Sequence, residues 1–217
     1  MSFAASRALF LDRDGTLDHP RHYPTRPEEL ELFEGLSGPL RTLQAVGYKL
    51  VMVTNQSGLA RGLFTRDDLA RMHSYLSQQL ADLGVHLDAI YHCPHHPDGT
   101  VEELTGSCDC RKPAPGMLLR AGRDLDLDLP RSWLVGDILD DVEAGHRARC
   151  RTVLVDLGTE SDPEQELRRP HYVARDTRHA LDLICAVEGL GAPVDLSYRP
   201  HSWSKTDGRP ALTGGAL

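Results

Sequence analysis

Short apolar runs alternate with segments of helical periodicity along most of the chain, and this alternation restricts the possible folds more than any other feature. The strand-like runs cover residues 8–11, 48–53, 87–92, 132–135 and 152–155. The helix-like segments cover residues 36–46, 65–83, 115–125, 142–149 and 177–187. Most of the runs are continuously apolar, as expected for strands buried on both faces. The alternation therefore predicts an α/β protein with a doubly wound parallel sheet.

Length and charge narrow the class of protein. The chain has 217 residues, which is enough for one domain with an appendage. Its 24 basic residues are outnumbered by 32 acidic ones, and the net charge of −8 argues against nucleic acid or an anionic membrane as a partner. No apolar run approaches the ~18 residues of a membrane span, and the N-terminus lacks a secretory pattern. We therefore expect a cytoplasmic monomer that acts on a small molecule.

The chain changes character after residue 189. Glycine and proline interrupt residues 190–217, and no hydrophobic period persists there. We predict one domain over residues 1–189 and a loosely ordered C-terminal extension over residues 190–217.

Acidic and polar residues follow the predicted strands. Asp12 and Asp14 come after the first strand, Thr54 and Asn55 after the second, and Asp137 after the fourth. Ligands of open α/β sheets bind at the carboxyl ends of the strands. The three carboxylates suit a Mg²⁺ site, because Mg²⁺ prefers oxygen ligands. An ordinary turn is the alternative interpretation of the Asp-x-Asp-Gly sequence by itself.

Four segments taken together are more specific. They are Phe10–Leu17 (FLDRDGTL), Val53–Asn55, Arg111–Pro113 and Gly136–Asp141 (GDILDD), in this order. With them the chain resembles phosphatases of the haloacid dehalogenase (HAD) superfamily. The resemblance implies a Rossmann-like fold and a Mg²⁺-dependent phosphomonoesterase.

The resemblance also implies roles for individual residues. Asp12 would be the nucleophile that forms an aspartyl-phosphate, and Asp14 would protonate the leaving oxygen and then activate water. Thr54 and the Asn55 backbone would hold the phosphoryl group. Lys112 would neutralise the charge of the phosphoryl group, and Asp137 would complete the Mg²⁺ site. These roles are consistent with phosphoryl transfer, which requires a well-positioned phosphoryl group and positive charge to neutralise it.

Cysteine and histidine form a second candidate metal site. Cys93-x-His95 and Cys108-x-Cys110 are separated by twelve residues and supply three thiolates and one imidazole. A Cys₃His set is typical of structural Zn²⁺ sites, and residues two apart in extended backbone point the same way. The alternative is three free core cysteines and a surface histidine. His92 and His96 are rival ligands, although His92 should face away from Cys93.

The residues around this candidate metal site point to a particular branch of the HAD superfamily. Residues 91–97, 108–113 and 55–62 are similar to the D-glycero-D-manno-heptose 1,7-bisphosphate 7-phosphatases and, less closely, to the histidinol-phosphatases. Zinc in the loop 93–110 would fix Arg111 and Lys112 toward the phosphate, and Arg111 is a candidate substrate contact. Only about twenty residues separate the first acidic pair from the next helix. We therefore expect no cap domain.

The chain differs from the heptose enzymes at two places that bear on the choice of substrate. Ile138 stands where the heptose enzymes usually carry a lysine, and Pro20–Tyr23 replaces their usual Asp-His-Gly-Tyr. Arg21 could replace the lost charge, or Arg21 and His22 are solvated loop residues. Our first choice of substrate is the heptose bisphosphate, with hydrolysis at the 7-phosphate. The alternatives are histidinol phosphate or another small phosphosugar, and a non-catalytic zinc-loop scaffold that binds phosphometabolites.

Overall fold

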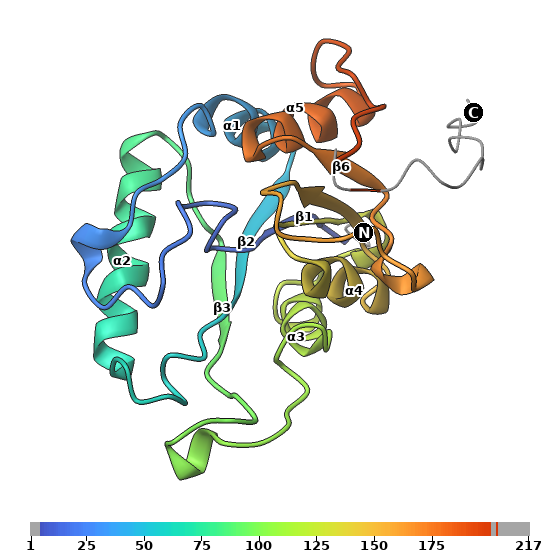
Figure 1. Ribbon diagram of the computed structural model, residues 1–217. Coiled ribbons are helices and arrows are strands. Elements are labelled where there is room, and N and C mark those ends of the chain that lie inside the picture. Colours follow the sequence, from blue (N-terminus) through green and yellow to red (C-terminus); the bar gives the residue numbers. More distant parts are fainter. Residues whose placement is uncertain (1–4, 201–202, 204–217) are drawn as a thin grey trace.

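The structure, a computed structural model, describes residues 5–200 and Trp203. Within these residues, parallel strands form one sheet in the order β3-β2-β1-β4-β5-β6 (Figure 1). The strands are β1 (Arg7–Leu11), β2 (Tyr48–Asn55), β3 (Ala89–Cys93), β4 (Trp133–Gly136), β5 (Arg151–Val155) and β6 (Tyr172–Ala174). The strand order reverses between β1 and β4, where an open α/β sheet forms its binding crevice. The predicted doubly wound parallel sheet is confirmed.

Helices cover both faces of the sheet (Figure 1). One face carries α1 (Ser37–Ala45), α2 (Arg66–Asp82) and α5 (Thr177–Val187), whose apolar side chains share one buried cluster. The other face carries α3 (Gly116–Asp124) and α4 (Leu139–Arg147), which share a second cluster. Short 3-10 helices lie in the connections at Pro27–Glu29, Glu102–Leu104, Leu129–Arg131 and Glu166–Arg168. Residues 5–200 contain no separate cap domain.

The central strand β1 shows why the strands are apolar throughout. Leu9 and Leu11 point into the cluster beneath α1, whereas Ala8 and Phe10 point into the cluster beneath α3. Successive side chains of a strand point to opposite faces, so a strand covered on both sides needs apolar residues at every position. Burying one such leucine contributes about 1.5–3 kcal/mol. The polar residues begin where this packing ends, at the carboxyl edge of the sheet.

Local capping sets the helix ends. Thr65 Oγ1 accepts a hydrogen bond from the Asp68 amide at 3.1 Å, and Asp68 Oδ2 accepts one from the Thr65 amide at 2.8 Å. This capping box confirms the predicted start of α2. Helix α4 begins at Leu139 rather than at 142, because Asp140 and Asp141 form its first turn, where carboxylates are favourable. The three-residue strand β6 is not predicted, since it is too short for a periodic signal.

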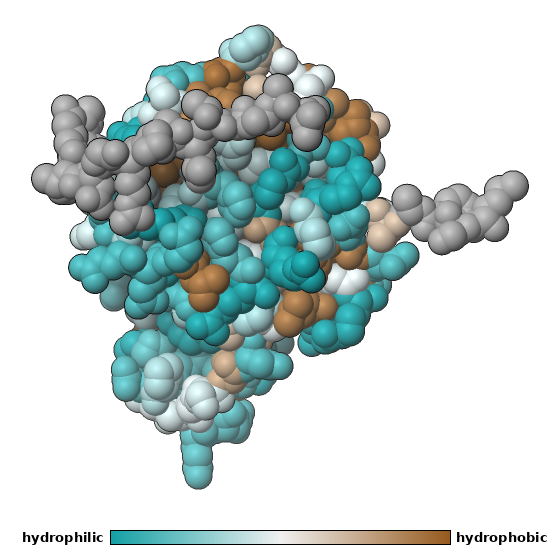
Figure 2. Space-filling model, turned by 90° about the vertical axis from the view of Figure 1, so that its right-hand side faces the viewer, coloured by the Kyte–Doolittle hydropathy of each residue, from teal (hydrophilic) through white to brown (hydrophobic). Residues whose placement is uncertain are grey.

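The C-terminal segment is described only in part. Residues 190–200 contain no helix or strand, but Leu190 and Val194 pack against the larger core cluster. The rest of the predicted extension, apart from Trp203, lies outside the described residues, so the domain boundary at residue 189 stays a prediction. Among the described helices, none is long and apolar enough to cross a bilayer. The face shown in Figure 2 is mainly hydrophilic, with small separate hydrophobic patches.

Candidate active site

The polar residues gather where the carboxyl ends of β1, β2 and β4 meet. β1 pairs in parallel with both β2 and β4, and the Asp12 amide continues the pairing by donating to the Val135 carbonyl at 3.0 Å. Thr54 and Asn55 end β2, and Asp137 follows β4. Parallel pairing therefore brings together three segments that are far apart in the sequence.

Three carboxylates form a buried cluster at this edge. Oxygen atoms of Asp12, Asp137 and Asp141 lie within 4.8 Å of one another. Two glycines allow this approach, because a Cβ at Gly15 would collide with Asp137, and a Cβ at Gly136 would collide with the carboxylate of Asp141. Gly15 also has a φ of +79°, which disfavours other residues. Converging buried carboxylates need cations beside them, and their oxygens are the ligands that Mg²⁺ prefers.

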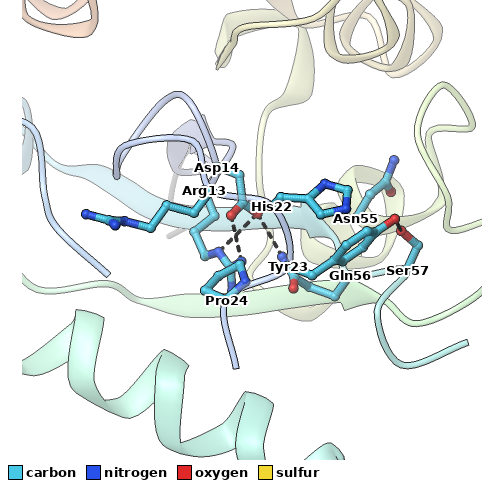
Figure 3. A pocket seen from close by; sticks show the side chains of 9 residues that line it. Arg13, Asp14, His22, Tyr23, Pro24, Asn55, Gln56 and Ser57 are labelled. Atoms are coloured by element: carbon cyan, nitrogen blue, oxygen red, sulfur yellow. Dashed lines mark hydrogen bonds and ion pairs between the residues drawn. The ribbon is translucent and has the colours of Figure 1, made fainter. Parts of the chain in front are cut away.

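The Asp14 carboxylate, predicted as a further Mg²⁺ ligand, lies outside this cluster. Arg13 donates to it from Nε at 3.1 Å and from Nη2 at 2.7 Å (Figure 3). Gln56 Nε2 donates to Asp14 Oδ2 at 3.0 Å and to Thr54 Oγ1 at 2.9 Å. A forked arginine–carboxylate contact is a strong, charge-assisted pair. Arg13 and Gln56 together fix the orientation of this side chain.

Lys112 is the buried cation of the site, with a side chain only 1% exposed. Its Nζ lies 2.6 Å from Asp12 Oδ1 and 2.5 Å from Asp141 Oδ1, and it donates to the Val53 carbonyl at 2.9 Å. Asn55 holds the Lys112 backbone, accepting from its amide at 3.0 Å and donating to its carbonyl at 3.1 Å. The Asn55 side chain therefore places Lys112, while the expected contact of the Asn55 backbone with a phosphoryl group stays a prediction.

Burial and mutual repulsion change the ionisation of these groups. Desolvation raises the pKa of Asp12 to about 7, opposed by the Lys112 ammonium. Desolvation, together with repulsion from Asp12 and Asp141, raises the pKa of Asp137 to about 8. Burial by itself would lower the pKa of Lys112, but Asp12 and Asp141 raise that pKa above its ordinary value, so Lys112 stays protonated. A further cation beside them would favour the ionised forms of Asp12 and Asp137 at neutral pH.

The loop between β3 and α3 brings the four predicted zinc ligands together. The sulfur atoms of Cys93, Cys108 and Cys110 lie 3.2–3.5 Å apart. His95 Nδ1 lies 3.7 Å from Cys93 Sγ and 3.4 Å from Cys110 Sγ. Tetrahedral Zn²⁺ with Zn–S bonds of about 2.3 Å separates its sulfur ligands by about 3.8 Å, whereas a disulfide joins them at about 2.05 Å. The spacing fits one four-coordinate zinc and does not fit a disulfide.

The rival histidines lie elsewhere. The His92 ring lies 5.7 Å from the ring of His73 on α2, so it faces away from the sulfur cluster as expected. His96 contacts Arg61 Nη2 through its Nε2 at 3.1 Å, and only His95 joins the cysteines. The hydrogen-bonded contact between Cys110 and Cys93 lowers the pKa of the Cys110 thiol to about 5. Cys110 is therefore a thiolate at neutral pH, and the thiolate is the form of cysteine that binds metal.

A pocket opens beside Asp14. Its lining residues are Arg13, Asp14, Arg21, His22, Tyr23, Pro24, Asn55, Gln56 and Ser57 (Figure 3). The wall from Arg21 to Pro24 is held by Tyr23, whose hydroxyl lies 3.4 Å from Ser57 Oγ. Arg21 pairs with Glu31 at 3.1 Å in an exposed ion pair. Arg111, predicted to contact substrate, does not line this pocket, and its Nη1 donates to the His95 carbonyl at 3.4 Å.

Comparison with known proteins agrees with this geometry. Residues 109–180 match the family model described as HAD-hydrolase-like. A D-glycero-beta-D-manno-heptose-1,7-bisphosphate 7-phosphatase from Photorhabdus laumondii is 45% identical over 160 residues, which are 73% of this chain and 85% of the relative. The enzyme of the same name from Escherichia coli K12 is 46% identical over 160 residues, which are 73% of this chain and 84% of the relative. This chain belongs to the HAD-like phosphatases.

A solved structure shares the fold of this HAD-like phosphatase. It is a D,D-heptose 1,7-bisphosphate phosphatase from B. bronchiseptica, complexed with magnesium and phosphate. The two structures superpose with a TM-score of 0.70 at 32% sequence identity, over 83% of this chain and 99% of the other. The likeness therefore extends over most of this chain.

Several residues of the site have no role in the sequence-based prediction. Asp141 completes the carboxylate cluster, but the run Gly136–Asp141 contains three acids and does not show which of them turn inward. Gln56 and Arg13 hold Asp14, and only their position beside predicted residues could have indicated this. Choosing among neighbouring polar residues requires the path of the backbone after each strand.

Asp18 is a further buried acid near the site. Its side chain is 1% exposed, and neither carboxylate oxygen has a hydrogen-bond partner among the described residues. Its backbone forms isolated bridges to Asp14 and to Leu32, which place it inside the loop that follows β1. Desolvation, then repulsion from Asp14, raises its pKa to about 8. The sequence gives no signal for this burial, because it depends on how the loop folds back on itself.

Proposed function

We propose that this enzyme is a Mg²⁺-dependent phosphomonoesterase that removes the 7-phosphate of D-glycero-D-manno-heptose 1,7-bisphosphate. The observation that carries the proposal is the meeting of Asp12 and Lys112 with Asp137 and Asp141 at one end of the sheet. The names of the relatives, and the magnesium and phosphate in the B. bronchiseptica structure, support it. Because all four of these residues are present, the alternative of a non-catalytic scaffold is disfavoured.

Asp12 is the proposed nucleophile. Its carboxylate oxygen forms a bond to phosphorus while the bond from phosphorus to the sugar oxygen breaks, which yields an aspartyl-phosphate. Asp14 gives its proton to the departing oxygen and then takes a proton from the water that hydrolyses the aspartyl-phosphate. Lys112 neutralises charge on the phosphoryl oxygens. Thr54 Oγ1 accepts from Gln56, which leaves the Thr54 hydroxyl proton free for a phosphoryl oxygen.

Asp12, Asp137 and Asp141 are the residues that would hold Mg²⁺. Their oxygens converge within 4.8 Å, and burial raises the pKa of Asp12 and Asp137, so the cluster favours a divalent cation. Bound Mg²⁺ supplies positive charge that keeps Asp12 ionised and stabilises the phosphoryl oxygens. The Asp14 side chain is engaged by Arg13, and we assign its carboxyl group to proton transfer, while its role as a further Mg²⁺ ligand stays a prediction.

Cys93, His95, Cys108 and Cys110 are the residues that would hold a structural Zn²⁺. The Arg111 amide donates to Cys108 Sγ at 3.3 Å, so the sulfur cluster is joined directly to the segment that carries Lys112. Zinc would therefore hold the loop that places the buried ammonium against Asp12. A metal held there would orient protein groups, and none of its four ligands lines the pocket beside Asp14.

The second phosphate of the substrate needs a cationic contact, because a desolvated dianion without partners is costly. Three arginines other than Arg13, whose guanidinium pairs with Asp14, are candidates for this contact. Arg61 and Arg111 contact the metal loop, through His96 and through the His95 carbonyl. Arg21 lines the pocket beside Asp14, and an exposed ion pair such as that of Arg21 with Glu31 is weak enough to exchange for phosphate. We therefore assign this contact to Arg21.

Histidinol phosphate, or another small phosphosugar, is the second candidate substrate. Ile138 favours it, because a substrate with one phosphate needs no lysine at this position. A cytoplasmic, monomeric enzyme without a nucleic acid or membrane partner remains our expectation.

Acid-quench trapping tests the mechanism. Wild-type enzyme mixed with the heptose bisphosphate and Mg²⁺, then quenched within one turnover, should carry a phosphoryl group on Asp12 that peptide mass spectrometry detects. Asp12→Asn keeps the shape but removes the attacking charge, so phosphate release should fall by about 10³-fold or more while the fold persists. Asp82→Asn, at the exposed end of α2, is the matched control. Near-wild-type phosphate release by Asp12→Asn would overturn the covalent mechanism.

A further inference from the structure

The described part of the C-terminal segment returns toward the active-site end of the sheet. After α5, Leu190 and Val194 pack on the cluster beneath α1 and α5. Tyr198 and Trp203 then pack on a small cluster formed by α4, β5 and β6. The segment therefore passes from one face of the sheet to the other beside the edge strand β6 (Figure 1). We call residues 195–200 together with Trp203 the strap.

α5 anchors the start of the strap. His179 Nε2 lies 3.2 Å from the Asp195 carbonyl, and the His179 ring meets the Tyr198 ring edge to face, with centroids 6.2 Å apart. Asp195 in turn accepts hydrogen bonds from the amide and the hydroxyl of Ser197, at 2.8 and 2.6 Å. These contacts give the strap a defined position on the helix before it reaches the β5–β6 edge.

The first contact of the strap with the site runs through Asp156, which follows β5. The Tyr198 hydroxyl donates to Asp156 Oδ2 at 2.7 Å, and the Gly158 amide donates to Asp156 Oδ1 at 2.9 Å. Tyr198 and Gly158 together fix the turn that contains Leu157. Leu157 lies beside Gly15, since a Cβ at Gly15 would be 3.0 Å from Leu157 Cδ1. The same Cβ would collide with Asp137, so this turn borders the place where Asp137 approaches the catalytic loop.

The second contact runs through the start of α4. Trp203 and Tyr198 pack against the small cluster that Leu139 and Val142 of α4 form with Leu154 and Val173. Leu139 is the first residue of α4, two positions after Asp137 and two before Asp141, and it is only 6% exposed. The strap thus contributes to burying the residue between two of the three clustered carboxylates.

We propose that the strap positions Asp137 and Asp141 for Mg²⁺. Tyr198 acts through Asp156 and Leu157, and Trp203 acts through Leu139. Both are positioning residues, since neither is part of the carboxylate cluster. Mg²⁺ demands near-octahedral oxygen ligands at about 2.0–2.1 Å, so a small displacement of a carboxylate weakens binding. The proposal rests on the assignment of these carboxylates to Mg²⁺ under the proposed function.

Calorimetric titration of the full-length protein with MgCl₂ tests the strap directly. Tyr198→Phe and Trp203→Ala should each raise the Mg²⁺ dissociation constant about three- to tenfold, with kcat at saturating Mg²⁺ within about twofold of wild type. Trp203→Phe should restore most of the affinity. Tyr198→Phe and Asp156→Asn remove the same hydrogen bond. The double variant should therefore bind Mg²⁺ no more weakly than whichever single variant binds it more weakly. Tyr75→Phe, on an exposed tyrosine of α2, is the control.

Three outcomes would contradict the proposed role of the strap. Variants with wild-type Mg²⁺ affinity and a lowered melting temperature would show that the segment only adds stability. Additive effects of Tyr198→Phe and Asp156→Asn would show that Tyr198 does not act through Asp156. A wild-type protein that binds no Mg²⁺ would overturn the proposed function as well as the strap, and that result appears in the wild type alone.

Discussion

Nζ of Lys112 lies 2.6 Å from Oδ1 of Asp12, although the two residues are 100 positions apart in the sequence. The ammonium also lies 2.5 Å from Asp141 Oδ1, so one buried cation serves the proposed nucleophile and a proposed metal ligand together. This arrangement prepares positive charge at the place where a phosphoryl group meets Asp12, before substrate arrives.

Lys112→Met should reduce phosphate release by about 10²–10³-fold, because it removes a charge aimed at the phosphoryl oxygens. It also leaves Asp12 and Asp141 without their partner, and breaking a buried pair costs about 3–5 kcal/mol of unfolding free energy. Lys112→Arg should not restore activity, since a planar guanidinium does not replace a compact ammonium in so closed a site. The exposed pair Lys49–Asp88 supplies the control Lys49→Met, which should leave both measurements unchanged. Wild-type turnover by Lys112→Met would contradict the assignment.

Metal analysis should find about one zinc per chain, as a Cys₃His site implies. Cys108→Ala should lose this zinc and lose activity, although the proposed chemistry uses no cysteine. Cys185→Ala, at a buried cysteine on α5, should keep the metal. Protein produced with zinc available but containing none would refute the zinc site.

Asp18 makes stability depend on pH. Its folded pKa of about 8 lies above the unfolded value of 3.8, so the folded state keeps a proton that the unfolded state releases. Stability is therefore lost as the pH rises from about 4 to about 8. Asp18→Asn stays neutral and should melt at least about 3 °C above wild type at pH 8, with the difference shrinking toward pH 4. Equal melting temperatures for Asp18→Asn and wild type across that range would contradict this; Asp162→Asn, at an exposed position, is the control.

Ile138→Lys should raise kcat/KM for the heptose bisphosphate, since an added phosphate contact strengthens transition-state binding. Arg21→Gln should lower kcat/KM for the bisphosphate and leave hexose monophosphates nearly unchanged, because it removes only the proposed contact to the second phosphate. Arg26→Gln, on an exposed arginine of the same loop, is the matched control. Equal losses on mono- and bisphosphates would place Arg21 outside the second-phosphate site.

The sequence predicts the central strands β1, β2 and β4 well because they are largely buried on both faces. The apolar run of β1 also ends sharply at a polar residue, where Asp12 follows Leu11. The sequence also predicts which strand ends meet, since parallel pairing places them at one edge. The alternation of side chains in extended backbone also separates His92 from Cys93, and the structure clusters the four residues predicted to bind zinc.

The details that escape sequence-based prediction depend on tertiary packing. Asp141 turns toward Lys112 because Gly136 leaves room for its carboxylate, and Asp14 turns toward Arg13 because both lie in the same loop. The burial of Asp18 likewise depends on a loop that has no periodic pattern. The orientation of Asp141 and the burial of Asp18 therefore depend on how the folded chain places these loops, which the sequence pattern does not show.

The most direct test of the account is the ranking of substrates by kcat/KM. Purified wild-type enzyme should be assayed for phosphate release from D-glycero-D-manno-heptose 1,7-bisphosphate, histidinol phosphate and hexose monophosphates under the same conditions with Mg²⁺. We predict the highest kcat/KM for the heptose bisphosphate, by a factor that Ile138→Lys increases. If the kcat/KM for histidinol phosphate exceeds that for the heptose bisphosphate by about tenfold, which is about 1.4 kcal/mol of transition-state discrimination, the heptose assignment is wrong and only the phosphatase mechanism remains.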